Sequence, residues 1–281
     1  MSAATSSGSG SAFAAVVRAE FIKLRRMPIV AATVLLLIGA NLLALVLARQ
    51  ESAALLAEEI RVNGFYVLAM GGRCAFGPFA LLLVVAATQS LAGEQERGQL
   101  RMTMVRPVSR AAFFGGRLAV YVLVAFAVAA LDLLIGLAFG APLGFADVAD
   151  VAVQGDRYGA AAMTTHTLLA YGLGALALAG TAAIALAISS FCAQATTAVT
   201  AGLVIGFLFV AVGFVFGERA ERFLLPNYVM REFHELVQLT TGVSVYRDAG
   251  ATARGILVPL TWLVGGWLLG WRAFERKEIR G

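Results

Sequence analysis

Charged residues are scarce in this chain, and so are cysteine and histidine. Only 14% of the 281 residues are charged, whereas 60% are hydrophobic. A soluble domain carries about a quarter charged residues, so this chain has too little polar surface to face water. Two histidines cannot build an imidazole-rich metal site, and the two cysteines, Cys74 and Cys192, lie far apart in the sequence. The composition therefore indicates a membrane protein and argues against a disulfide or metal framework.

The motifs that would signal chemistry within this chain are also missing. No G-x-x-x-x-G-K-[ST] phosphate loop occurs, which argues against ATP binding by that device. The run His234-Glu-Leu-Val-Gln238 resembles the zinc motif H-E-x-x-H, but Gln238 replaces the second histidine ligand. An intramembrane aspartate protease needs two acids within spans, and we find one. We therefore expect no catalytic, cofactor or metal site.

Six long apolar runs predict an all-α polytopic membrane protein, since about 20 apolar residues suffice to cross the hydrocarbon as a helix. The second run is preceded by residues 65–75, which include Gly71, Gly72 and Arg73 and are expected to form a broken approach to the membrane. A further amphipathic helix is predicted around Tyr228–Leu239. The transmembrane domain is expected over residues 28–271, with spans at about 29–48, 76–92, 118–139, 164–188, 195–216 and 255–271.

The N-terminal region has a different pattern. Residues 1–12 are rich in Ser, Gly and Ala and are expected to form a disordered tail. Over residues 13–27 apolar and charged side chains alternate at helical spacing, which predicts an interfacial amphipathic helix with its basic residues toward lipid headgroups. The alternative is a helical extension of the first span. The expected apolar face holds Phe13, Val16, Val17, Phe21 and Leu24, and the charged face holds Arg18, Glu20, Lys23, Arg25 and Arg26.

The distribution of basic residues predicts the orientation. With six spans, both termini lie on the same side. That side carries thirteen Lys and Arg residues close to span ends, whereas the other carries nine among eleven acids. Because basic residues are retained in the cytoplasm, we expect both termini, and the tail 272–281, to be cytoplasmic. The positive charge thus sets topology and does not indicate nucleic acid.

One acid, Asp132, is expected inside a span, where an ionisable group is costly. We expect Asp132 to face the interior of the bundle and to pair with Arg73 or His166. Such a pair would line the outer part of a pathway, or it would be a structural ion pair between spans. Glycines spaced by four, such as Gly202 and Gly206 in the fifth span, also allow close helix packing or a dimer contact.

The stretch from Glu94 to Arg117 resembles the permease subunit of bacterial ABC-2 type ABC transporters. In that family an acidic residue ends the second span and is followed by Glu-x-Gly-Thr-Leu, Pro-[Val/Leu]-Ser-Arg and then Gly-Lys. This chain departs from the pattern at two positions, with Gln99 in place of Thr and Arg117 in place of Lys. The ends of the chain also resemble those of the family, in the N-terminal run Glu20–Pro28 and the C-terminal run Phe274–Ile279. The matching positions are Glu94, Glu96, Gly98, Leu100, Pro107, Val108, Ser109, Arg110 and Gly116.

This resemblance implies a half-transporter in the bacterial inner membrane. Two permeases, identical or homologous, would form an export pathway driven by separate cytoplasmic ATP-binding subunits. The loop after the second span would hold a short coupling helix, capped by Glu94 and Glu96 and ended by Pro107, and the turn at 189–194 would make a smaller contact. The residues implied in coupling are Glu94, Glu96, Arg97, Gly98, Leu100, Pro107, Ser109 and Arg110.

Two other functions fit the sequence. A polytopic membrane scaffold or anchor would position partner proteins without moving a substrate, and the basic loop would then serve only to fix topology. A secondary carrier would use an ion gradient through Asp132, without any ATPase and with internal repeats of broken spans. The substrate is not encoded in any motif that we recognise.

Overall fold

The structure is a computed structural model that describes residues 8–55, 62–100, 109–149, 157–217, 222–241 and 249–277. Most of these residues are helical, and the others form turns and short connections, the short 3-10 turn η2 (Ala141–Leu143) and two paired two-residue strands, β1 (Val148–Ala149) and β2 (Arg157–Tyr158). The helices are α1 (Gly8–Arg25), α2 (Pro28–Leu55), α3 (Gly64–Glu96), α5 (Arg110–Gly140), α6 (Ala160–Phe191), α7 (Ala195–Phe216), α9 (Leu225–Thr240) and α10 (Ala249–Arg276).

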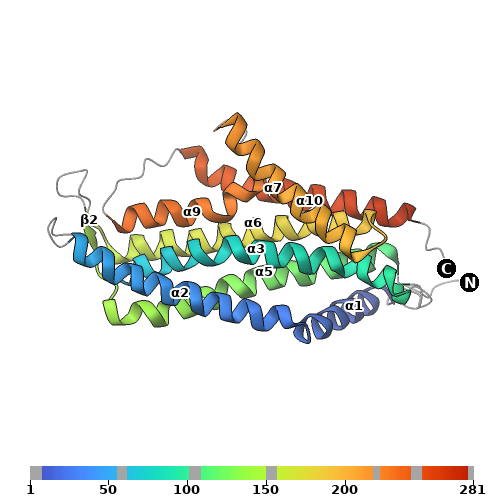
Figure 1. The fold of residues 1–281 in the computed structure, drawn as a ribbon, viewed down its shortest axis with the longest axis horizontal. Coiled ribbons are helices and arrows are strands. Elements are labelled where there is room, and N and C mark those ends of the chain that lie inside the picture. The colour runs from blue at the N-terminus through green and yellow to red at the C-terminus, as the bar shows by residue number, and fades with distance from the viewer. Residues whose placement is uncertain are drawn as a thin grey trace, which may run out of the picture.

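Six of the described helices, α2, α3, α5, α6, α7 and α10, are long and apolar enough to cross a membrane. This confirms an all-α polytopic membrane protein. Four of them, α2, α3, α5 and α6, lie side by side along the long axis, with α10 beside α6, whereas α7 leans away from the rest (Figure 1). The helix α6 lies at the centre and packs against α3, α5, α9 and α10. Several helices extend beyond their expected spans. For example, α3 has 33 residues.

Small residues allow α10 to pack closely on α6. A Cβ added at Gly266 would lie 2.8 Å from the backbone of Ala183, and one added at Gly270 would lie 2.9 Å from the Cα of Ala187. The glycine pair of α10 therefore serves a contact within the chain. In α7, Gly202 likewise packs against α3, while the Cβ position of Gly206 contacts no other helix that the structure describes.

The expected break before the second span is wrong, because α3 is one continuous helix from Gly64 to Glu96. The glycines at 71 and 72 serve close packing. A Cβ added at Gly71 would lie 2.4 Å from Asn41 Oδ1 in α2, and one at Gly72 would lie 2.2 Å from the ring of Phe233 in α9. The predicted amphipathic helix lies within α9, and its Phe233 ring packs between Phe76 and Tyr171 at 4.5 and 4.9 Å.

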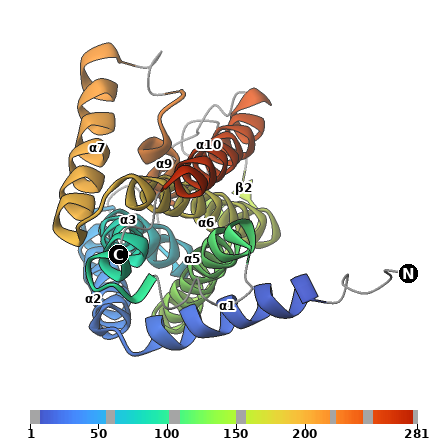
Figure 2. The same cartoon turned by 90° about the vertical axis from the view of Figure 1, so that its right-hand side faces the viewer.

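The N-terminal helix α1 lies across the end of the bundle where α10 ends, as the view along the bundle shows (Figure 2). It begins at Gly8, before the expected start at residue 13; residues 1–7 lie outside the described part. Among its side chains from residue 13 onward, the buried ones are Val16, Glu20 and Leu24, which are four residues apart and so share one face. Phe21 is 57% exposed. The expected division of α1 is therefore corrected: Glu20 faces the bundle, not the headgroups.

Candidate functional site

The stretch after α3 begins with a sharp turn. The helix ends at Glu96, and Gly98 follows with a φ of 68°, a left-handed conformation that favours glycine. The chain is helical again at residues 99–100, where Leu100 is buried. Residues 101–108, including the predicted Pro107, lie outside the described part. At the other side of this gap, Ser109 caps α5 by accepting a hydrogen bond from the Ala112 N–H at 3.1 Å.

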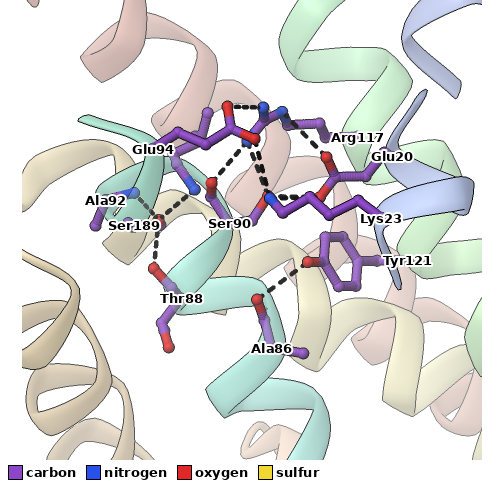
Figure 3. Close-up of polar contacts among 12 residues, drawn as sticks. Glu20, Lys23, Ala86, Thr88, Ser90, Ala92, Glu94, Arg117, Tyr121 and Ser189 are labelled. Carbon is purple, nitrogen blue, oxygen red and sulfur yellow. Dashed lines mark hydrogen bonds and ion pairs between the residues drawn. The ribbon is translucent and has the colours of Figure 1, made fainter. Parts of the chain in front are cut away.

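Four charged side chains meet where α1, α3 and α5 come together, and we call Glu20, Lys23, Glu94 and Arg117 the charged cluster (Figure 3). Lys23 Nζ donates to Glu94 Oε1 at 3.0 Å and lies 3.6 Å from Glu20 Oε1. Arg117 pairs with Glu94 through Nη2, and its Nε lies 3.8 Å from Glu20 Oε2. Two cations and two carboxylates balance, so the cluster is neutral. Such balance is needed because Glu20 and Arg117 are each only 3% exposed.

The guanidinium nitrogens of Arg117 bind different partners in this cluster. While Nη2 binds Glu94, Nη1 donates to the carbonyl of Ser90 at 2.8 Å and to its hydroxyl at 2.9 Å. The Ser90 hydroxyl in turn donates to Glu20 Oε1 at 2.9 Å, and the guanidinium lies 4.3 Å above the ring of Phe113. A lysine has one nitrogen and could not make all these contacts. Arginine at this position therefore binds α3 at two points a turn apart.

The side chain of Ser189 in α6 forms hydrogen bonds with backbone groups of α3 (Figure 3). Its hydroxyl donates to the carbonyl of Thr88 at 2.5 Å and accepts from the N–H groups of Leu91 and Ala92 at 3.1 and 3.0 Å. In a regular helix, the N–H of Ala92 would donate to the carbonyl of Thr88. A side chain inserted in this way is a recognised cause of helix bending. The last turns of α3, which carry Ser90 and Glu94, are thus held by α6.

The short turn between α6 and α7 lies at the same end. Glu96 Oε2 accepts a hydrogen bond at 3.0 Å from the backbone N–H of Ala195, the first residue of α7. A carboxylate in this position also stabilises the helix dipole. The predicted second contact region therefore connects directly to the end of α3.

The C-terminal end of α10 is bound there too. Arg110 Nη1 donates to the carbonyls of Phe274, Glu275 and Lys277, at 3.4, 2.5 and 3.3 Å. Lys277 Nζ donates to the carbonyls of Ser190 and Cys192, at 2.9 and 2.6 Å. Burial lowers the pKa of the Lys277 ammonium. Residues 278–281 of the predicted tail lie outside the described part.

Asp132 forms a second polar cluster, deeper in the bundle. It is fully buried, and its two oxygens accept from Asn41 Nδ2 at 2.7 Å and from the Tyr171 hydroxyl at 3.1 Å. Among the residues that the structure describes, the contacts of Asp132 are thus with Asn41 and Tyr171, whereas the sequence led us to expect Arg73 or His166. Both carboxylate oxygens are already bound by neutral donors from α2 and α6. Asp132 lies 15 residues beyond Arg117 on α5, about 22 Å along the helix.

Several residues of these two clusters were not predicted from the sequence. Glu20 had a signal, since it stands four residues from both Val16 and Leu24, which are apolar. Asn41 is a lone amide within an apolar run and also had a signal. Ser189 had none, because small hydroxyl residues are common in membrane helices and nothing local shows that its partners belong to α3.

The comparison with protein families decides the class. A family profile described as ABC-2 family transporter protein matches residues 16–213, more than two thirds of the chain. The chain belongs to this family. No curated protein sequence matches it significantly.

ABC-2 family membership and the six apolar helices together make this a multi-pass membrane protein of the ABC transporter class. The matched range includes the charged cluster, Ser189 and Asp132. It ends near the end of α7, so α9 and α10 lie outside it.

Proposed function

We propose that this chain is the permease half of an ATP-driven exporter, in which ATP is hydrolysed by separate cytoplasmic subunits. The observation that carries the proposal is the meeting of four segments at one end of the bundle: the turn after α3, the start of α5, the turn before α7 and the end of α10. A partner that docks at this end contacts segments from most of the spans. Motion of the partner would therefore reach the whole bundle.

We assign the coupling contact to the stretch that runs from Glu94 to Arg110. Its supporting features are the left-handed turn at Gly98 and the exposed side chains of Glu96 and Arg97 beside it. Leu100 is buried and anchors the far side of the turn. Pro107, Ser109 and Arg110 complete the stretch, as the family resemblance implies.

The charged cluster would transmit movement of the stretch from Glu94 to Arg110 to the helices of the bundle. Glu94 lies two residues before the end of α3 and is bound by Lys23 of α1 and Arg117 of α5. Movement of Glu94 would thus pull α1 and α5 with it. Ser189 would resist or guide this movement, because it holds the same turns of α3 to α6. The three helices and α6 would then move as a connected set.

The proposed location is the bacterial inner membrane, with both termini in the cytoplasm. Support comes from the thirteen basic residues assigned to this side and from their position close to span ends. Export is the direction that the family resemblance favours.

A second permease, identical or homologous, would complete the pathway. We assign α7 to this contact because it is the least covered of the spans and exposes Phe207, Val210 and Phe214, the last at 90%. Gly206 leaves open space on the same helix.

Purification of the tagged chain from its own membranes tests the proposal. We expect a protein with a phosphate loop to co-purify, and we expect this to fail when residues 99–108 are replaced by a Gly-Ser linker. A linker at residues 150–156, between β1 and β2, is the control and should leave co-purification intact. Absence of any ATP-binding protein from the intact chain would favour a scaffold or an ion-driven carrier.

A further inference from the structure

An apolar groove that plays no part in the proposed coupling lies beside the junction of α1 and α2. A cavity of about 240 Å³ lies between α1, α2, α3 and α5. Its floor is buried and includes Leu83, Tyr121 and Val128, while Phe21, Val30 and Leu131 at its edges are exposed. The groove is therefore open to the surroundings of the bundle. In Figure 2, α7, the proposed contact for a second permease, lies on a different side of the bundle from α1.

The groove has the length of one lipid leaflet. On α5 it extends from Tyr121 to Leu131, ten residues later, which is about 15 Å of helix. The hydrocarbon core of a bilayer is about 30 Å thick, so 15 Å corresponds to half of it. Tyr121 lies one turn from Arg117 of the charged cluster, which places this half at the end of the bundle that holds α1.

The charge that the described lining residues carry lies at the mouth of the groove. Among the lining residues that the structure describes, Arg25 is the one charged residue, and it lies in the last turn of α1. Its guanidinium is exposed and forms no ion pair with another described residue. Tyr121 and Thr33, the polar side chains of the lining, have their hydroxyl groups satisfied by backbone carbonyls. Within the described part of the chain, the groove thus offers an apolar channel with the guanidinium of Arg25 at its entrance.

We propose that this groove binds the acyl chain of an anionic glycerophospholipid from the leaflet next to the termini, with Arg25 at its phosphate. The groove's length of about 15 Å, its apolar lining and the position of Arg25 at its mouth all match such a lipid. Because Phe21 and Leu24 line the groove while Glu20 and Lys23 belong to the charged cluster, the lipid would brace the same helix that Glu94 and Arg117 bind. The proposal does not depend on an ATP-binding partner.

Photocrosslinking in nanodiscs tests it, using phosphatidylglycerol and phosphatidylcholine that carry a diazirine on the acyl chain. Crosslinks mapped by mass spectrometry should concentrate on the lining residues of α2, α3 and α5. Ala127→Trp fills the exposed part of the groove and should abolish this concentration. Ala138→Trp is the matched control, because Ala138 is exposed on nearly the same face of α5, three turns further along, and is not a lining residue.

The headgroup preference is tested separately. Arg25→Gln should lower the preference for phosphatidylglycerol over phosphatidylcholine by about fivefold, while acyl crosslinking persists. Arg18→Gln removes the same charge from an exposed position two turns earlier on α1 and should have little effect. Equal crosslinking over all exposed apolar residues, no effect of Ala127→Trp, crosslinks to a second protein copy, or equal effects of the two arginine changes would overturn the proposal.

Discussion

Arg117 of α5 forms a buried ion pair with Glu94 near the end of α3, 23 residues earlier in the chain. The pair is completed by Lys23 and Glu20 of α1, so that three helices share one neutral cluster. This cluster lies two residues from the turn that we assign to the contact with an ATP-binding subunit. The predictions below test its energetics and the packing around it.

Replacement of Arg117 should strongly destabilise the chain. Arg117→Leu leaves two carboxylates with one cation in a buried place, which costs about 3–5 kcal/mol. Arg117→Lys keeps the charge but loses part of the fork, and its cost should be about 1 kcal/mol. The measurement is thermal unfolding in detergent, with Arg272→Leu, an exposed residue at the same end, as the control. Equal melting temperatures for Arg117→Leu and Arg272→Leu would contradict the structure.

The hydrogen bonds from Ser189 of α6 to the backbone of α3 can be tested by replacing two adjacent serines. Ser189→Ala removes the hydroxyl that joins the carbonyl of Thr88 to two N–H groups, and unsatisfied buried groups cost about 1–3 kcal/mol. Ser190 is equally buried but donates to Ala187 in its own helix, so Ser190→Ala should cost less. Hydrogen exchange at Leu91 and Ala92 should accelerate in Ser189→Ala alone. Faster exchange in both variants would show that the hydroxyl of Ser189 is not the cause.

Close packing around Asn41 predicts different outcomes for two glycines. Gly71→Ala places a Cβ 2.4 Å from Asn41 Oδ1, and such overpacking costs about 1–3 kcal/mol. Gly39→Ala adds a Cβ where no atom lies within 4 Å, and it should stabilise the helix by about 0.5–1 kcal/mol. Thermal unfolding of the two variants gives the comparison. The packing would be misplaced if Gly71→Ala melted at or above the temperature of Gly39→Ala.

Asp132 should contribute chiefly to packing among α2, α5 and α6. Asp132→Ala removes one acceptor from Asn41 and one from Tyr171, which also contact the backbone carbonyls of Leu37 and Leu68 at 2.9 and 3.0 Å. The loss of each hydrogen bond should therefore cost about 0.5–1.5 kcal/mol. Tyr171→Phe removes one of these bonds and should be milder. Unfolding and transport are measured on the same preparations. A variant that folds with the stability of the parent chain but no longer transports would instead make Asp132 part of the pathway.

Sequence predicts the larger features of this fold and misses those that depend on pairing. The apolar runs predict six spans, and the run Ala195–Phe216 matches α7 at both ends. The break expected at Gly71 fails because a glycine that makes room for Asn41 looks the same in sequence as one that breaks a helix. Ser189 and Tyr171 are invisible for a similar reason, since neither carries charge and both act across long sequence separations.

In the candidate site, too, the sequence predicts some residues but not the contacts that they make. Glu94 and Ser109 were predicted because they belong to a motif, but a motif does not show which side chains bind them. Glu20 was assigned to the lipid-facing side by its charge alone. Its buried position near Arg117, whose Nε lies 3.8 Å from Glu20 Oε2, becomes apparent only when α1 and α5 are placed together.

The central claim is that the end of the bundle with the turn after α3 meets an ATP-binding subunit. Site-specific photocrosslinking tests it most directly, with p-benzoylphenylalanine at Gln99, which is exposed beyond Gly98, or at Ala141, which is exposed at the opposite end of α5. The account predicts an ultraviolet-dependent adduct with a phosphate-loop protein from Gln99 and none from Ala141. Adducts from Ala141 alone, or from neither position in a complex that contains the ATP-binding protein, would contradict it.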